Sequence, residues 1–261
     1  RPLFVLLLLP TFLLSVTLKE RFREGSNGDY IVIEQNKTYT LLNIHTKNED
    51  EIILEEISIP SHLASSKEFK WKEWVRTGAA GHTSWIMYEV DFENDRITES
   101  YSFTRKAFAS IDSNNSFLLS LLKISLDPIP RADRRRIGLA PPQGEEENRK
   151  LWNPPQYIEG KRIKKPAYDA FGAIWPKDNS ELSEKEIELY FDQTHQNFPF
   201  PYWIQISGNS LSYKIRTLDS GKNLQSPFTE LPRRAPTILG TLKKQENSYM
   251  LTVKCPSFIQ D

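Results

Sequence analysis

The sequence is poor in the residues that build metal and redox sites. Its 261 residues include one cysteine and four histidines. A single cysteine excludes a disulfide framework and any zinc or iron–sulfur site that needs several cysteine ligands. The histidines are scattered, and the chain contains neither a His-Glu-x-x-His nor a Gly-x-Ser-x-Gly motif. We therefore expect no metal or other cofactor and no catalytic centre of a common motif type.

The chain also lacks an excess of charge of either sign. Lysine and arginine together number 34, as do aspartate and glutamate, so the formal net charge is zero. This balance is unlike the basic footprint of a nucleic-acid-binding protein. Hydrophobic residues make up 38% and aromatic residues 11% of the chain, which is too apolar for a disordered protein. The length is sufficient for a substantial core.

A short, almost purely apolar run opens the sequence. Residues 3–14 follow Arg1 and are nearly all leucine, phenylalanine or valine, and small residues come next in Ser15-Val16-Thr17. A basic start, a short apolar centre and small residues after it are typical of a secretory signal peptide. The run is too short for a hydrocarbon core of about 30 Å. We interpret residues 1–18 as a signal peptide or N-terminal anchor, with a buried core helix as the alternative.

This segment predicts an exported protein of the bacterial periplasm or cell envelope. Because no cysteine follows the apolar run, it is not a lipoprotein signal. We expect contact with a membrane only through this segment or through a basic loop.

The body of the chain reads as antiparallel strands joined by short polar turns. In residues 19–127, the ranges 30–33, 38–45 and 52–59 predict a meander, residues 69–75 a further strand, and 84–103 a hairpin. Residues 117–126 favour a short helix because their leucines are not β-branched, although a core strand is the alternative. In the third strand Glu55 interrupts an apolar face, and we interpret it as a carboxylate at a sheet rim that faces water.

A second strand-rich part covers residues 168–261 and is expected to belong to the same domain. Its predicted strands are 170–175, 187–192, 203–206 and 211–218, followed by a hairpin over 238–254. The two strand-rich parts form either two sheets or one continuous sheet. The fold class is therefore mainly β: an antiparallel, curved, half-barrel-like sheet with few short helices and a long proline-rich insertion.

That insertion spans residues 128–167. It holds seven prolines, and its ten basic residues outnumber its five acidic ones by five. The proline content leaves little room for regular structure. A solvated loop is one interpretation. The other is a basic surface for anionic lipid head groups, worth about 1 kcal/mol per basic residue, with Arg134, Arg135, Arg136, Lys164 and Lys165 as its candidates.

Six tryptophans are many for one chain. Tryptophan in a sheet is first a core residue, and the alternative is a groove for an apolar ligand. The candidates for such ligand binding are Trp71, Trp74, Trp85, Tyr202 and Trp203. A hydrolase that uses His82, which shares a side of the chain with Ser84, is a further alternative.

The order of these features is similar to that of the LolA/LolB-type periplasmic carriers: a leading signal, an early antiparallel meander, a proline-rich crossing segment and later strands. The resemblance implies a curved, incomplete β-barrel that holds an acyl chain. The segments Leu189-Tyr190-Phe191-Asp192 and Phe198-Pro199-Phe200-Pro201-Tyr202-Trp203-Ile204 also resemble uncharacterised bacterial envelope proteins. We expect an exported, non-catalytic protein that binds a lipid or lipoprotein acyl chain in a concave sheet, or else an envelope scaffold that binds other proteins.

Overall fold

The computed structural model describes residues 16–64, 69–111, 116–195, 198–208, 212–234, 239–245 and 248–254. The leading apolar run, residues 3–14, lies outside the described residues, so its interpretation as a targeting signal stays a prediction. Residues 16–18 are part of the fold, because Val16 and Thr17 pair with a later strand and Leu18 is fully buried in the core.

Sixteen strands and three α-helices make up the described part. The strands in its first half are β1 (Val16–Thr17), β2 (Tyr30–Gln35), β3 (Thr38–Lys47), β4 (Glu51–Pro60), β5 (Ser84–Asp91), β6 (Arg96–Ser102), β7 (Ala107–Phe108) and β8 (Ser125–Pro128). The strands in its second half are β9 (Tyr157–Ile158), β10 (Lys161–Arg162), β11 (Tyr168–Ile174), β12 (Glu186–Asp192), β13 (Trp203–Ser207), β14 (Ser212–Gly221), β15 (Leu239–Gln245) and β16 (Ser248–Lys254). The helices are α1 (Leu18–Glu24), α2 (Trp71–Arg76) and α3 (Phe117–Lys123), with a 3-10 turn, η1, at Ser61–Leu63.

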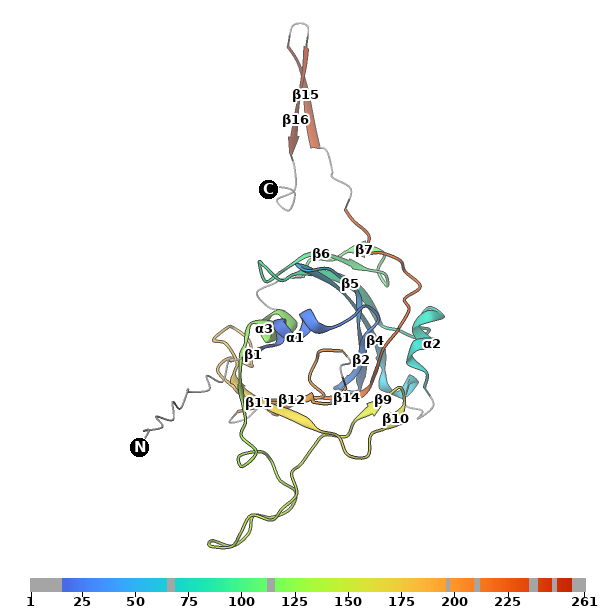
Figure 1. The fold of residues 1–261 in the computed structure, drawn as a ribbon. Coiled ribbons are helices and arrows are strands. Elements are labelled where there is room, and N and C mark those ends of the chain that lie inside the picture. Colours follow the sequence, from blue (N-terminus) through green and yellow to red (C-terminus); the bar gives the residue numbers. More distant parts are fainter. Residues whose placement is uncertain are drawn as a thin grey trace, which may run out of the picture.

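One curved antiparallel sheet joins the two strand-rich parts of the chain (Figure 1). Its twelve strands run in the order β1-β8-β11-β12-β13-β14-β2-β3-β4-β5-β6-β7. The pairing of β14 with β2, in which Gly221 lies opposite Tyr30, makes the sheet continuous across the insertion. The edge strands β1 and β7 do not pair with each other, so the sheet is not closed into a barrel. These features confirm the predicted fold class.

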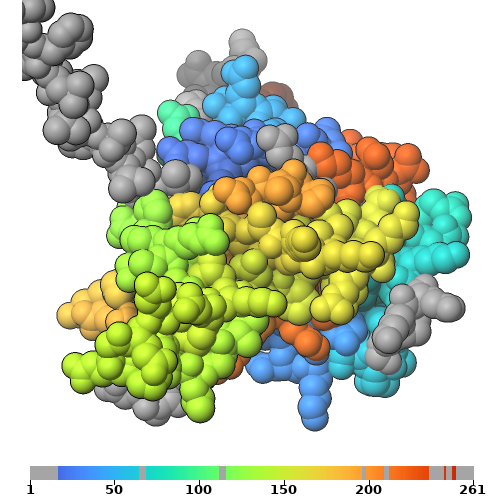
Figure 2. Space-filling model, turned by 60° about the horizontal axis from the view of Figure 1, so that its bottom comes forward, coloured from blue at the N-terminus to red at the C-terminus, as the bar shows by residue number. Residues whose placement is uncertain are grey.

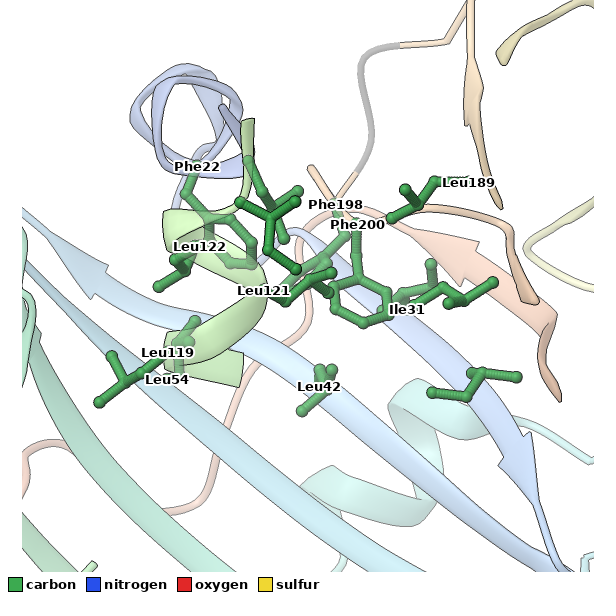
Figure 3. Close-up of a cluster of buried hydrophobic side chains, with 14 of the residues drawn as sticks. Phe22, Ile31, Leu42, Leu54, Leu119, Leu121, Leu122, Leu189, Phe198 and Phe200 are labelled. Atoms are coloured by element: carbon green, nitrogen blue, oxygen red, sulfur yellow. The ribbon is translucent and has the colours of Figure 1, made fainter. Parts of the chain in front are cut away.

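The concave face of the sheet packs on α1 and α3 (Figures 1 and 3). Thr17 caps α1. Its hydroxyl accepts a hydrogen bond from the Glu20 backbone N–H, and the Glu20 carboxylate accepts one from the Thr17 backbone N–H. From α1, Phe22 points inward and meets Phe198 edge-on at 5.4 Å between ring centroids. The leucines of α3 enter the same core, which confirms the predicted helix at the start of 117–126. The concave side of the curve is therefore largely filled.

The outer, convex face is also covered, by three segments. Helix α2 and residues 222–234, here called the C-terminal strap, lie over β2–β6. The ring of Phe228 in the strap stacks on Phe103 at 3.7 Å. The proline-rich insertion lies over β11–β13, where Trp152 meets Tyr190 edge-on at 5.3 Å. Figure 2 shows the insertion, from yellow-green to yellow, spread over this face. The insertion is thus partly packed against the sheet, while its tip around Leu139 is exposed.

Two local predictions were wrong, for identifiable reasons. Residues 69–75 contain a helix, α2, and not a strand. Trp71, Trp74 and Val75 are its buried residues, and their i, i+3, i+4 spacing is the helical period that the alternating interpretation overlooked. Glu55 does not face water at a rim, because it is fully buried under the C-terminal strap. Its carboxylate accepts hydrogen bonds from Asn43, Trp85 and Ser226 at 3.0, 2.8 and 2.7 Å.

The last two strands form a separate hairpin. β15 pairs with β16 in a regular antiparallel register, as predicted from the sequence. In Figure 1 this hairpin projects away from the curved sheet. The exposed side chains of the hairpin include Tyr249 and Met250.

Candidate functional site

An apolar pocket remains on the concave face beside α3. Its volume is about 280 Å³. Strands β2–β6 and β14 supply one side of it, and α3 and the segment around Phe200 supply the other. The lining is mostly aliphatic and aromatic: Ile33, Leu42, Ile97, Ile111, Phe117, Leu118, Phe200, Tyr213 and Ile215, with Gln35, Thr40, Ser116, Glu56 and Tyr88 as the polar members. We call it the concave pocket.

The concave pocket has one strongly polar group, the Glu56–Tyr88 pair. Both residues face inward because they share the concave side of β4 and β5 with residues such as Leu54 and Val90. Burial raises the pKa of the Glu56 carboxyl, and a hydrogen bond with Tyr88 opposes that shift. Burial likewise raises the pKa of the Tyr88 hydroxyl well above its ordinary value. Glu56 nevertheless keeps some accessible surface, since it lines the cavity.

This arrangement has a clear chemical consequence. A carboxyl with a raised pKa is protonated over a wider pH range, and in that form it can donate as well as accept a hydrogen bond. A mostly apolar cavity with a few convergent polar groups and a perturbed pKa is the usual form of a small-molecule site. Alternation in the sequence puts Glu56 on the same strand face as Ile52 and Leu54, but the sequence analysis singled out Glu55 on the opposite face and gave Glu56 no role.

The five aromatic residues predicted to bind a ligand lie on the outer face instead. Trp71 and Trp74 pack against each other on α2, with ring centroids 5.7 Å apart. Trp85 is buried beneath the C-terminal strap. Tyr202 and Trp203 belong to a third cluster, beneath the insertion. The structure therefore brings Trp71, Tyr202 and Trp203 to the edge of one outer cavity and leaves Trp74 and Trp85 in the core.

The predicted basic residues divide into two groups. Three arginines hold the insertion in place. The guanidinium of Arg134 donates to the Tyr168 carbonyl at 2.7 Å, Arg135 lies 4.7 Å from the Trp152 ring centroid, and Arg136 donates to the Arg149 carbonyl at 2.8 Å. Lys164 and Lys165 are exposed. Of the predicted basic surface, only these two lysines are both exposed and without a side-chain hydrogen bond or ion pair to the described residues.

The arrangement around His82 does not resemble a nucleophile–base pair. Its Nδ1 lies 2.9 Å from the Ala79 carbonyl oxygen, and its ring meets Trp85 edge-on. In the described part of the chain, no serine hydroxyl or carboxylate forms a hydrogen bond with it. The same residues contain no group of three or more histidine, cysteine, aspartate or glutamate side chains placed to hold a metal ion. None of the described helices has the length and apolar character needed to span a membrane.

Comparison with known proteins identifies a bacterial counterpart of this fold. Residues 40–164 match the family model described as CT021 protein. The chain is similar in structure to the hypothetical protein CT021 from Chlamydia trachomatis. The match has a TM-score of 0.62 and 18% identity, and it covers 85% of this chain and 100% of that one. At this identity the likeness shows the fold alone. None of the curated proteins matches, and the reported matches give no support to a LolA/LolB resemblance.

Proposed function

We propose that the protein binds a short acyl chain, or a similarly small apolar molecule with one hydrogen-bonding end, in the concave pocket. The observation that supports this is a single carboxyl–phenol pair, Glu56 and Tyr88, inside an otherwise apolar cavity. The chain would lie against Leu42, Ile97 and Ile215, and its polar end would meet the pair.

The size of the pocket restricts its occupant. At about 280 Å³ it lies just below the usual range for ligand sites, roughly 300–1,000 Å³. Helices α1 and α3 occupy much of the remaining concave volume, so a wide hollow for several acyl chains is not available. The proposal is therefore binding of one short chain, which is narrower than the lipoprotein carrier predicted from the sequence.

Isothermal titration calorimetry with octanoic acid tests the proposal on the full chain. We expect saturable one-site binding with a negative heat-capacity change, because apolar surface is buried. Leu118→Trp, which places a larger side chain in the pocket from α3, should abolish the binding. Trp203→Leu, on the outer face, is the matched control and should leave it unchanged.

Two results would contradict the proposal. One is the absence of saturable binding by the wild-type protein. The other is unchanged binding by a folded Leu118→Trp protein. Should that variant fail to fold, Ile97→Phe fills the same cavity from β6 and serves as the second test.

We also propose that the protein is exported, on the basis of the apolar run at residues 3–14. A fusion of the full chain to alkaline phosphatase, which is active only outside the bacterial cytosol, tests this. Loss of reporter activity on replacing Leu7 and Leu8 by arginine would support export, and an inactive reporter on the unchanged chain would refute it.

A further inference from the structure

A second and larger cavity lies on the outer face, between α2 and the insertion. Its volume is about 600 Å³. Six aromatic residues line it: Tyr39, Phe69, Trp71, Tyr157, Tyr202 and Trp203. We call it the outer cleft. It is separated from the concave pocket by the sheet itself, because the two cavities lie on opposite faces of β3 and β14: Thr40 and Leu42 line the concave pocket, whereas Tyr39 and Leu218 line the outer cleft.

Aromatic rings lie on both sides of the outer cleft. On the α2 side, Trp71 lies 4.6 Å from Phe69 and 6.2 Å from Tyr39 between ring centroids. On the other side, Trp203 of β13 meets Trp152 of the insertion at 5.1 Å between ring centroids. Aromatic faces in such a cleft favour flat or ring-shaped groups, which stack on them or meet them edge-on.

The charges around the outer cleft favour an anion. Arg162 lines it, is exposed, and has no ion-pair partner among the described residues. Arg216 also lines it and pairs with Glu34, so it adds little net charge. The one acidic lining residue, Asp219, is buried, and its Oδ1 accepts a hydrogen bond from the Gly160 backbone N–H at 3.0 Å. Burial also raises the pKa of Asp219. The accessible charge at the mouth is therefore positive.

The two walls belong to different segments that meet at one end of the cleft. There Lys72 of α2 donates to Glu159 of the insertion at 2.6 Å and to the Lys222 carbonyl at 3.2 Å. A ligand in the cleft would contact both segments. Its binding would therefore hold the insertion against α2.

We propose that the outer cleft binds a small anion that carries a flat ring, with the ring between Trp71 and Trp203 and the anionic group beside Arg162. Free aromatic acids and nucleotides share this chemistry. The inference is independent of the proposed acyl-chain binding, because it concerns the opposite face of the sheet.

Calorimetric titration of the full chain with phenyl phosphate, inorganic phosphate and phenol tests whether both parts of the ligand are needed. We expect phenyl phosphate to bind at least about tenfold more tightly than phosphate or phenol alone, since only it makes the stacking and the charge contact. AMP and benzoate then distinguish nucleotides from aromatic acids as the better class. Equal affinities for phenyl phosphate and inorganic phosphate would overturn the proposal.

Two variants locate the binding. Arg162→Ala should weaken phenyl phosphate binding about three- to fivefold, as one partly exposed charge contact implies, whereas Arg131→Ala, elsewhere on the insertion, should not. Tyr157→Leu should also weaken it, through loss of a ring. The pocket-filling Leu118→Trp should have no effect, which separates this proposal from the first. Unchanged affinity in folded Arg162→Ala and Tyr157→Leu proteins would refute the site.

Discussion

Removal of the Glu55 carboxylate should destabilise the protein severely. Glu55 is fully buried, and three donors point at it: the Asn43 amide, the Trp85 indole N–H and the Ser226 hydroxyl. In Glu55→Ala all three lose their acceptor within the protein. An unsatisfied buried polar group costs about 1–3 kcal/mol, and Glu55→Ala leaves three such donors. Allowing for relaxation, we expect a loss of about 3–5 kcal/mol in the free energy of unfolding.

Glu55→Gln is the matched control, and its effect can be worked out from the same hydrogen bonds. Trp85 and Ser226 both donate to Oε1, which a glutamine oxygen can replace. The new Nε2 would face the Asn43 Nδ2, but the Asn43 Oδ1 is buried without a hydrogen-bond partner. Rotation of the Asn43 amide by half a turn therefore restores the third bond. We expect Glu55→Gln to cost about 1 kcal/mol, the usual value of one hydrogen bond.

Urea unfolding monitored by tryptophan fluorescence measures both variants, since Trp85 lies at the site. The reasoning fails if Glu55→Ala loses less than about 1 kcal/mol, the value of a single hydrogen bond. It also fails if Glu55→Gln is as unstable as Glu55→Ala, because then hydrogen bonding would not be the cause.

Two more predictions concern the concave pocket and the insertion. The raised pKa of Glu56 means that its contribution to stability is fully present below the ordinary glutamate pKa, about 4.3, and is lost as pH rises through the higher value in the folded protein. Glu56→Gln should therefore become more stable relative to wild type as pH increases in that window, and a pH-independent difference in urea midpoints would contradict this. Trp152→Ala should lower the free energy of unfolding by about 2 kcal/mol, which is less than the usual loss for a tryptophan in a core because this ring is only half-buried. The same substitution should speed proteolytic cleavage near Leu139. An unchanged cleavage rate would show that Trp152 does not anchor the insertion.

The strands were largely predictable from sequence because at least one face of each packs on a core. Ile52 and Leu54 share one face of β4 and Ile57 and Ile59 the other, and this alternation is visible in the chain itself, as is the polar turn between β5 and β6. The curvature was anticipated as well. Local pattern also favoured a helix at α3, where leucine predominates.

What lies against each face could not be read from local pattern. Both faces of β4 are buried, so Glu55 is enclosed by a strap that arrives from 171 residues later in the chain. No periodicity near Glu55 indicates that contact. The meeting of the candidate aromatic residues could not be predicted for the same reason. Trp71 and Trp203 are far apart in sequence, and only the packing of α2 and the insertion on one face brings both to the outer cleft. Alternation alone puts Glu56 on the face opposite Glu55, but it does not show which of the two faces is concave.

The positions of the two cavities follow from the lengths of the segments that cover the sheet. Helix α3 has 7 residues, so it spans about 10 Å, whereas the 10-residue strand β3 spans about 33 Å. A helix that short cannot cover the concave side of such a strand from end to end, and the concave pocket lies beside α3 where this cover ends. On the outer face, α2 is shorter still, with 6 residues, and it meets the insertion where Lys72 contacts Glu159. Cavities at the ends of short covers can change size with small movements of those covers while the sheet stays fixed. Ligand binding at either cavity should therefore be more sensitive to substitutions in α3, α2 and the insertion than to conservative changes in the strands beneath.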